Sequence, residues 1–328
     1  MKILRVGDPH VQVSNLKDSE ALIDFVMSTA VDQNVDRIEF LGDMFHTHAV
    51  VRIEVVNFWQ RKLFEIGLET GIEVFLLCGN HDQPGSKEKE QEMNALQTLK
   101  NCHPLVKVID SPIHDDYANI SYLPYFSDEK QLLEACQKIF EDGSGELLIA
   151  HQTFTGAQYE NGFFSEEGID PELIPHKAII SGHIHKSQQV GKCFYPGTPK
   201  WDTMADANQP KGIWIFQHED TGAVKSKEFF PTDHIVTPIK TYEVKEGDKL
   251  PELNPEARNY VILEGKSAWI SKIKKDLSKL ASIKVKPTDR ITKVNKDNSI
   301  TLEKYLETEF QPIEGVDKQD IKQFVSNL

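Results

Sequence analysis

The sequence predicts an α/β fold in which two sheets form a sandwich flanked by helices, followed by a small α/β capping domain and a C-terminal helical tail. Short apolar runs typical of buried strands alternate with amphipathic helical segments in the first two thirds of the 328 residues. Polar residues end these runs at spacings of 35 residues from Asp8 to Asp43 and 37 residues from Asp43 to Asn80. Such spacings suit successive strand–helix–strand units, which places these polar residues at one edge of a sheet.

The composition changes near Pro231, which predicts three parts in the chain. Residues 1–235 contain the alternating strands and helices and form the first expected domain. Residues 236–298 contain strand-like runs and a helical stripe over 267–280, which is typical of a small α/β domain. Residues 299–328 contain two helical stretches that are too short to be stable alone. This tail therefore packs either on its own domain or on a partner protein.

The first domain shows a regular succession of elements. The expected strands lie at residues 3–6, 37–41, 73–78, 106–109, 119–123, 147–150 and 178–181. Helices are expected over 19–32 and 53–66, where apolar residues recur at helical spacing. Residues 193–195 and 212–216 are expected to form a second sheet that packs on the first.

The composition excludes several classes of protein. A hydrophobic content of 39% and a charged content of 27% are ordinary for a globular chain, and no apolar run approaches the ~20 residues that span a bilayer. The first residues are no signal peptide because Arg5 interrupts the apolar run. The four cysteines form no CxxC pair, which favours reduced thiols and a cytoplasmic protein.

The charge is distributed unevenly along the chain. A net charge of −14 and a pI near 5.3 argue against a protein that coats nucleic acid unaided. Residues 266–296, however, hold ten basic and two acidic residues, a net charge of +8. This segment is either the solvated face of a helix or a surface that contacts nucleic acid.

Side chains that can bind metal ions stand at or just after the ends of the expected strands. They are Asp8, His10, Asp43, His46, Asn80, His81, Asp82, His151, His183 and His185. Two of the pairs, Asp8 with His10 and His183 with His185, are two residues apart, so both members point to the same side of an extended chain. We therefore expect these side chains to converge on one site.

This set of ligands is suited to phosphate chemistry. Two divalent ions about 3.5–4 Å apart can bind a phosphate, generate a hydroxide and neutralise an in-line transition state. Such a centre needs a bridging carboxylate with imidazoles and oxygen ligands around it. Imidazole and oxygen ligands without thiolate favour Mn²⁺, Fe²⁺ or Zn²⁺ over a structural zinc site with cysteines.

The chain resembles the calcineurin-like metallophosphoesterases, whose pattern D-x-H, GD, GNH[DE], H and GHxH stands here in order. The resemblance implies Asp8, His10, Asp43 and His185 as ligands of a first metal. It implies Asp43, Asn80, His151 and His183 as ligands of a second metal, with Asp43 bridging. It further implies His81 as the catalytic histidine that protonates the leaving oxygen. Asp82 is expected to orient His81, or alternatively to cap a turn.

Within that family the closer resemblance is to the SbcD-type DNA repair and recombination nucleases, including phage recombination nucleases. Met44-Phe45-His46 follows Asp43 where protein phosphatases have Asp-Arg-Gly, and Asp82 follows His81 where they have Glu. The resemblance implies a role for His46 in nuclease activity. The segment from Tyr195 to Pro199, followed by Lys211-Gly212, is also similar. The likeness covers residues 1 to roughly 235.

The expected function is that of a two-metal DNA nuclease, a 3′→5′ exonuclease on duplex ends with single-strand endonuclease activity. Mn²⁺ is the expected ion, with Mg²⁺, Fe²⁺ or Zn²⁺ as alternatives. The resemblance implies a homodimer that acts with an SbcC-type SMC-like ATPase in the cytoplasm, or in the host cytoplasm for a phage protein. It also implies that residues 236–298 contact DNA and that the tail binds the ATPase. The alternatives are a phosphodiesterase or phosphatase acting on nucleotides or phosphoproteins, and a non-catalytic scaffold.

Overall fold

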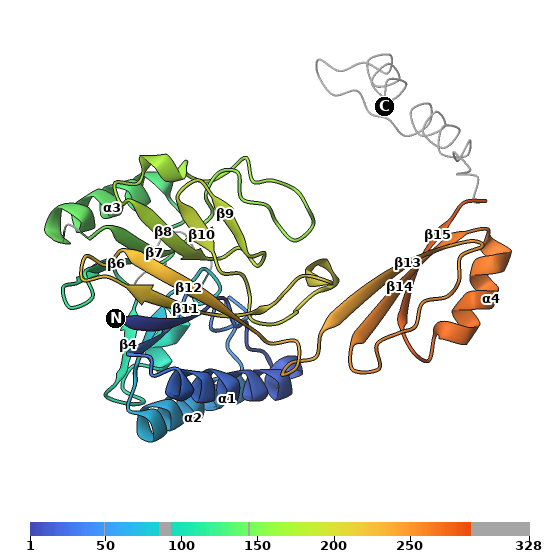
Figure 1. The fold of residues 1–328 in the computed structure, drawn as a ribbon, viewed down its shortest axis with the longest axis horizontal. Helices are drawn as coiled ribbons and strands as arrows, with labels where there is room; N and C mark the ends of the chain where they lie inside the picture. The colour runs from blue at the N-terminus through green and yellow to red at the C-terminus, as the bar shows by residue number, and fades with distance from the viewer. Residues whose placement is uncertain (49, 85–92, 144, 290–328) are drawn as a thin grey trace, which may run out of the picture. The chain divides into compact units, whose positions relative to one another are not determined.

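The structure is a computed structural model that describes residues 1–48, 50–84, 93–143 and 145–289 (Figure 1). The expected tail over 299–328 and the end of the lysine-rich segment over 290–296 lie outside the described residues. Within the described part of the chain, no helix combines the length and the apolar character needed to cross a membrane.

The first sheet has six strands in the order β12-β11-β1-β2-β3-β4. Their bounds are β1 Lys2–Val6, β2 Arg37–Phe40, β3 Glu73–Leu77, β4 Val106–Ile109, β11 Gly212–His218 and β12 Val224–Pro231. Strands β1 to β4 run parallel, while β11 and β12 add antiparallel strands on the side of β1. Strands β1, β2 and β3 are almost fully buried, which explains why most of their residues are apolar.

The second sheet also has six strands, in the order β5-β6-β7-β8-β10-β9. Their bounds are β5 Ile113–Asp115, β6 Ile120–Leu123, β7 Leu147–His151, β8 Ala178–Gly182, β9 Gln188–Val190 and β10 Cys193–Tyr195. The four inner strands are parallel, and β5 and β9 are antiparallel edges. The predicted two-sheet fold is therefore confirmed.

The prediction that residues 193–195 and 212–216 share the second sheet was wrong for the latter segment. Strand β10 pairs with β8 in the second sheet, but β11 pairs with β1 in the first, with Leu4 opposite Ile215. Between β1 and β12, the side chains of β11 are mostly buried. An apolar run predicts burial in a sheet, but the run alone does not identify which sheet the strand joins.

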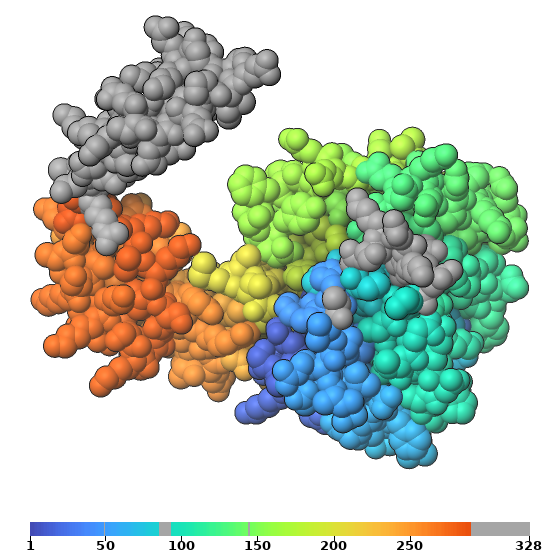
Figure 2. Space-filling view, turned by 180° about the vertical axis from the view of Figure 1, so that it is seen from behind, coloured from blue at the N-terminus to red at the C-terminus, as the bar shows by residue number. Residues whose placement is uncertain are grey.

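Three helices cover the outer faces of the two sheets. Helices α1 (Leu16–Asp32) and α2 (Ile53–Thr70) lie side by side on the first sheet, and α3 (Glu129–Gly143) contacts β5 and β6 of the second (Figure 1). The α1–α2 layer forms the blue outer surface in Figure 2. Helix α2 ends at Gly71, whose φ of 67° provides a left-handed cap without a Cβ clash.

Apolar residues fill the space between all of these layers. One cluster, which includes Leu22 and Trp59, lies between the helices and the first sheet. A second, which includes Phe75 and Ile149, joins residues of the two sheets. A third, around Leu132 on α3, covers the outer face of the second sheet. Together these clusters fix the two sheets against each other, which makes the ends of their strands a rigid frame.

A buried network of charges also joins the two sheets. Glu39 on β2 lies 2.7 Å from Arg5 on β1, its neighbour in the parallel register, and accepts a hydrogen bond from Tyr122 on β6. Arg37 lies 2.6 Å from Asp115 on β5. Arg5, Arg37 and Glu39 are each at most 1% exposed. Because buried charges are costly unless they are paired, this network is a specific link between the sheets.

The described chain divides into two compact units, Met1–Thr241 with Glu252–Tyr260, and Tyr242–Pro251 with residues 261–289. The elements of this C-terminal region are β13 Ile239–Lys245, β14 Arg258–Gly265, α4 Ser267–Leu277 and β15 Ser282–Pro287, with strand order β13-β14-β15. The lysines of α4 are exposed, and so is Leu280, since the helix ends before it. The boundary predicted at residue 235 stays a prediction.

Candidate metal centre

The topology brings the predicted ligands together from both sheets. Strands β1, β2 and β3 are parallel neighbours, and Asp8, Asp43 and Asn80 follow their carboxyl ends. In the second sheet, His151 ends β7 and His183 follows β8, its parallel neighbour. The packed sheets present these five residues from adjacent strand ends, so residues that are up to 175 positions apart in sequence are hydrogen-bonded to each other.

One group of candidate ligand atoms lies around His10. The Nε2 atoms of His10 and His185 lie 3.0 Å apart, and Nε2 of His10 lies 3.5 Å from Oδ2 of Asp43. Two nitrogens that bind one ion at about 2.1 Å and at a right angle are themselves about 3.0 Å apart. The two imidazoles therefore fit a shared ion. We call His10, His185 and Oδ2 of Asp43 the first ligand group.

A second group surrounds the other oxygen of Asp43. Oδ1 of Asn80 lies 2.9 Å from Nε2 of His151 and 2.8 Å from Nδ1 of His183. Nε2 of His151 lies 3.4 Å from Oδ1 of Asp43. We call Asn80, His151, His183 and Oδ1 of Asp43 the second ligand group. Asp43 thus offers one oxygen to each group, which is the arrangement of a carboxylate that bridges two ions.

Glycines and unusual backbone conformations allow this close approach. A Cβ on Gly42 would lie 2.1 Å from Nδ1 of His151, and a Cβ on Gly79 would lie 2.3 Å from Oδ1 of Asp43. His10, Asp43 and His183 have φ angles of 42°, 52° and 82°. Non-glycine residues rarely adopt positive φ, and such strain persists where the surrounding structure imposes it. The backbone therefore holds three of the ligand residues in conformations that they would not adopt freely.

Asp8 is fully buried and lies closer to the second group than the resemblance implied. Its carboxylate accepts the backbone N–H of His183, with N–O distances of 2.9 and 3.1 Å. Its Oδ1 atom also lies 3.4 Å from Nδ1 of His151. In the described structure Asp8 therefore orients two ligands of the second group, and its assignment to a first metal stays a prediction.

His81 lies beside the first ligand group, but a backbone carbonyl orients it. Its ring centre is 4.7 Å from that of His10, and its Nδ1 atom lies 2.6 Å from the carbonyl oxygen of His46. Because a carbonyl only accepts, Nδ1 carries the proton of the neutral ring and Nε2 is the nitrogen left for a substrate. The ring of His46 stacks near that of His81, with centres 5.9 Å apart.

Asp82 makes contacts other than the expected one with the His81 ring. Its Oδ1 accepts the N–H of Phe45 at 3.1 Å, and its Oδ2 accepts the N–H of Gly79 at 2.9 Å. These bonds tie the turn after β3 to the turn after β2. Asp82 therefore holds the backbone that carries Asp43 and Asn80, as in the alternative in which it caps a turn.

Burial and neighbouring charges shift the pKa values of the ligand residues, so that some are ready to bind a metal ion and others carry a proton. Burial lowers the pKa of His183 to about 3 and that of His10 well below its usual value, so both imidazoles are neutral. Burial raises the pKa of Asp8 to about 6. Burial opposes charge on His151 and Asp43 too, but their mutual attraction outweighs it. The pKa of His151 rises to about 9 and that of Asp43 falls.

The structure also places near the centre several residues that the sequence did not single out. The ring of His48 stacks on His81, with centres 4.0 Å apart, and its Nδ1 lies 2.9 Å from the carbonyl oxygen of Asn80. Oε1 of Glu160 accepts the N–H of His185 at 3.0 Å. The ring of Tyr125 stacks on His183 at 5.8 Å. None of these residues belongs to a strand-end motif, so no pattern in the sequence indicated them.

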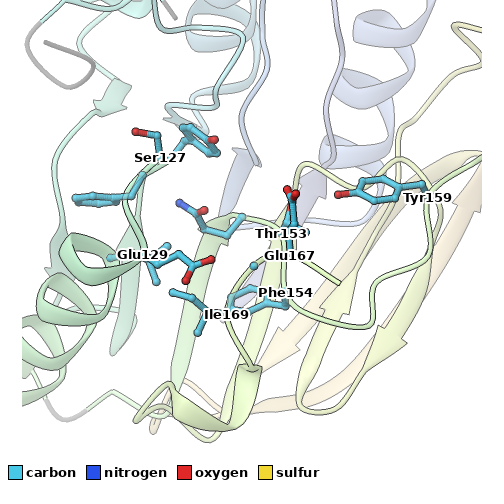
Figure 3. A pocket seen from close by; sticks show the side chains of 12 residues that line it. Ser127, Glu129, Thr153, Phe154, Tyr159, Glu167 and Ile169 are labelled. Carbon is cyan, nitrogen blue, oxygen red and sulfur yellow. The ribbon is translucent and has the colours of Figure 1, made fainter. Parts of the chain in front are cut away.

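A cavity of about 160 Å³ adjoins the second ligand group. It lies between the start of α3 and the loop after β7, with Glu129, Thr153 and Glu167 among its lining residues (Figure 3). Tyr125 lines this cavity and also stacks on His183, while Gln152 in its wall directly follows His151. The cavity therefore offers space beside the metal ligands for a small part of a substrate.

Comparison with known proteins agrees with this geometry. Residues 1–187 match the family described as calcineurin-like phosphoesterase. The chain belongs to this family. Members of this family use divalent metal ions. Two clusters of imidazole and carboxylate atoms at this centre are suited to such ions, His10 with Asp43 and His81, and Asp43 with His151 and His183. This member is accordingly a metal-dependent phosphoester hydrolase.

The phosphoesterase shares low sequence identity with individual relatives and solved structures. It is 26% identical over 249 residues to exonuclease subunit 1 of Enterobacteria phage T4, covering 71% of this chain and 68% of that protein. It is 27% identical to putative phosphoesterase 078R of Invertebrate iridescent virus 3, covering 60% of this chain and 57% of that one. A 5′-nucleotidase precursor from Thermus thermophilus superposes with a TM-score of 0.37 and 10% identity, covering 70% of this chain and 54% of the nucleotidase.

Proposed function

We propose that this phosphoesterase is a DNA nuclease, a 3′→5′ exonuclease on duplex ends and an endonuclease on single strands. The position of Asp43 carries the proposal, since its two oxygens serve two converging ligand groups. That arrangement suits the hydrolysis of phosphodiesters by two metals. The T4 relative is named an exonuclease subunit, which supports DNA as the substrate.

The chain contributes the positions of the groups around the scissile phosphate. Two divalent ions, when bound, supply a hydroxide nucleophile and charge neutralisation; Mn²⁺ is the ion we propose. The carbonyl oxygen of His46 accepts a hydrogen bond from Nδ1 of His81, so Nε2 is the nitrogen that faces the substrate. When the ring is in its doubly protonated imidazolium form, Nε2 donates its proton to the leaving oxygen. His46 lies next to both His10 and His81, so its ring lines the space that a DNA strand would enter.

Binding of DNA needs positive charge, whereas the net charge of the first unit is negative. The second unit carries four exposed lysines between residues 272 and 279, which suit contacts with phosphates. We propose that these lysines bind the DNA backbone. We further propose that the protein works as a homodimer with an SbcC-type SMC-like ATPase in DNA repair or recombination. The T4 relative is named a subunit, which supports a partner.

The test is a nuclease assay with the purified full chain on end-labelled duplex DNA in Mn²⁺ or Mg²⁺. It is run with and without the proposed ATPase partner, and bis(p-nitrophenyl) phosphate serves as a substrate without bases. Metal-dependent shortening of the duplex, lost in His81→Ala, supports the proposal. Hydrolysis of the model diester without any cleavage of DNA would overturn it in favour of a phosphodiesterase. No hydrolysis of either substrate would point to a scaffold.

A further inference from the structure

Two lysines are buried next to the first ligand group, on the segment between β10 and β11. Lys200 and Lys211 are each 2% exposed. Each is paired with an aspartate of the same segment: Lys200 lies 2.5 Å from Asp202, and Lys211 lies 2.7 Å from Asp206. Keeping an ammonium buried costs several kcal/mol unless its partners compensate for the lost water. The atoms that the two ammonium groups contact therefore indicate the role of Lys200 and Lys211.

Lys211 uses all three of its N–H donors within this segment and the first ligand group. Its Nζ atom donates to Oδ1 of Asp206, to Oγ1 of Thr198 at 2.8 Å and to the carbonyl oxygen of His185 at 2.9 Å. The backbone N–H of Thr198 also donates to that carbonyl, at 3.1 Å. A lysine has three donors, so this ammonium group is saturated and its position is fixed.

These contacts hold His185 from several sides. Oδ1 of Asp206 lies 3.9 Å from its Nδ1, and Oε1 of Glu160 lies 3.9 Å from the same atom. Lys211 binds its carbonyl oxygen, and Glu160 binds its N–H. Nε2 is left to face His10 at 3.0 Å. The Lys211–Asp206 pair thus acts on a ligand of the first group.

Lys200 acts on the other imidazole of the same group. Its Nζ lies 3.4 Å from the carbonyl oxygen of His10, which also accepts from Nδ2 of Asn15 at 3.0 Å. Asn15 in turn lies 3.4 Å from Oδ1 of Asp202. His10 has a φ of 42°, a conformation that needs support from its surroundings. The lysines of two separate ion pairs therefore contact the backbone carbonyl oxygens of the two histidines of the first ligand group.

We propose that Lys200–Asp202 and Lys211–Asp206 are positioning pairs that set the metal affinity of the first ligand group alone. The inference rests on the proposed function only in requiring that the centre bind two divalent ions. The second group, with Asn80, His151 and His183, is held instead by Asp8 and by the carbonyl oxygen of Leu41. Loss of either pair therefore weakens one of two metal sites. Outer partners of this kind typically contribute about 10–100-fold to metal affinity.

The test measures Mn²⁺ binding to the full-length chain by titration calorimetry, together with the free energy of unfolding in EDTA. Lys211→Met removes the charge and keeps the length of the side chain. The double variant Lys211→Met/Asp206→Asn removes both charges of the pair. Lys62→Met is the matched control, because Lys62 is 3% exposed and lies 2.6 Å from Asp24, in an ion pair between α1 and α2.

Wild-type protein is expected to bind two Mn²⁺ ions, and Lys211→Met to bind one of them about 10–100-fold more weakly. The double variant should regain stability, since no unpaired charge stays buried, yet keep the weak site. Lys62→Met should lose stability with both affinities unchanged. If Lys211→Met does not fold, the double variant and Lys200→Met decide the question by the same readout.

Three results would overturn the inference. They are wild-type affinities in the lysine variants, equal weakening of both sites, and recovery of affinity together with stability in the double variant. The first and third results would mean that the pairs act on stability only, and the second would mean that they are not specific to the first ligand group. Wild-type protein that binds fewer than two ions would instead contradict the two-metal centre, so failure of the proposed function is recognised separately.

Discussion

Replacement of Glu39 by Gln tests whether the buried charge network holds together the strands that carry the metal ligands. Glu39 on β2 is the register neighbour of Arg5 on β1, and the ends of these strands lead to Asp43 and Asp8. The variant keeps the shape of the side chain and removes only its charge. Arg5 then keeps the neutral ring of His218, 2.8 Å away, and no carboxylate at salt-bridge distance within the described residues.

The expected loss is large because neither partner is in contact with water. Removing one member of a fully buried ion pair costs about 3–5 kcal/mol, since the other charge stays buried and unpaired. The loss in the free energy of unfolding is limited because Arg37 keeps its ion pair with Asp115, at 2.6 Å. For a unit of this size, each kcal/mol lowers the melting temperature by roughly 2–4 °C, so a decrease of about 6–20 °C is expected.

The assay is urea unfolding followed by circular dichroism, in EDTA so that bound metal does not contribute. Glu73→Gln is the control, because Glu73 is partly exposed and lies 3.3 Å from Arg37 in the same network. A partly exposed pair contributes about 0–1 kcal/mol. A loss below about 1 kcal/mol in Glu39→Gln, or equal losses in the two variants, would refute the reasoning.

Three further predictions concern the centre and the DNA surface. His81→Ala should keep two bound Mn²⁺ ions but cleave DNA about 100-fold or more slowly in the end-label assay; near wild-type rates would exclude a role in proton transfer. Reversing the charge of the four lysines between residues 272 and 279 should weaken DNA binding and flatten the dependence of DNA affinity on salt concentration. An unchanged salt dependence would indicate that these lysines only form a solvated surface. Burial opposes the charge on His151, but the carboxylates of Asp43 and Asp8 outweigh it and raise the pKa of His151 to about 9, so Mn²⁺ must displace its proton. Affinity measured by calorimetry should therefore fall about tenfold per pH unit from pH 8 to pH 6.5, whereas a constant affinity would contradict the assigned proton.

The sequence predicted the fold and the convergence of the ligands because both depend on local patterns. Apolar runs that end in Gly42-Asp43 or Gly182-His183 identify buried strands and place polar side chains at their carboxyl ends. The pairing of β11 with β1 joins segments more than 200 residues apart, and the apolar pattern of a strand carries no information about its partner. That is why residues 212–216 were assigned to the wrong sheet.

The supporting residues were harder to predict for a related reason. Asp82 binds two backbone N–H groups rather than the ring beside it, and a motif of side chains does not show backbone donors. His48 and Glu160 reach the centre through the path of their loops. Lys211 was recognised as part of a familiar segment, but its role depends on the carbonyl oxygen of His185, 26 residues away in sequence.

Whether two ions share Asp43 can be determined from an anomalous difference map of a crystal soaked in Mn²⁺. Two peaks about 3.5–4 Å apart are expected, one beside Oδ2 of Asp43 with His10 and His185, the other beside Oδ1 with Asn80, His151 and His183. A single peak, or two peaks that do not share Asp43, would contradict this arrangement.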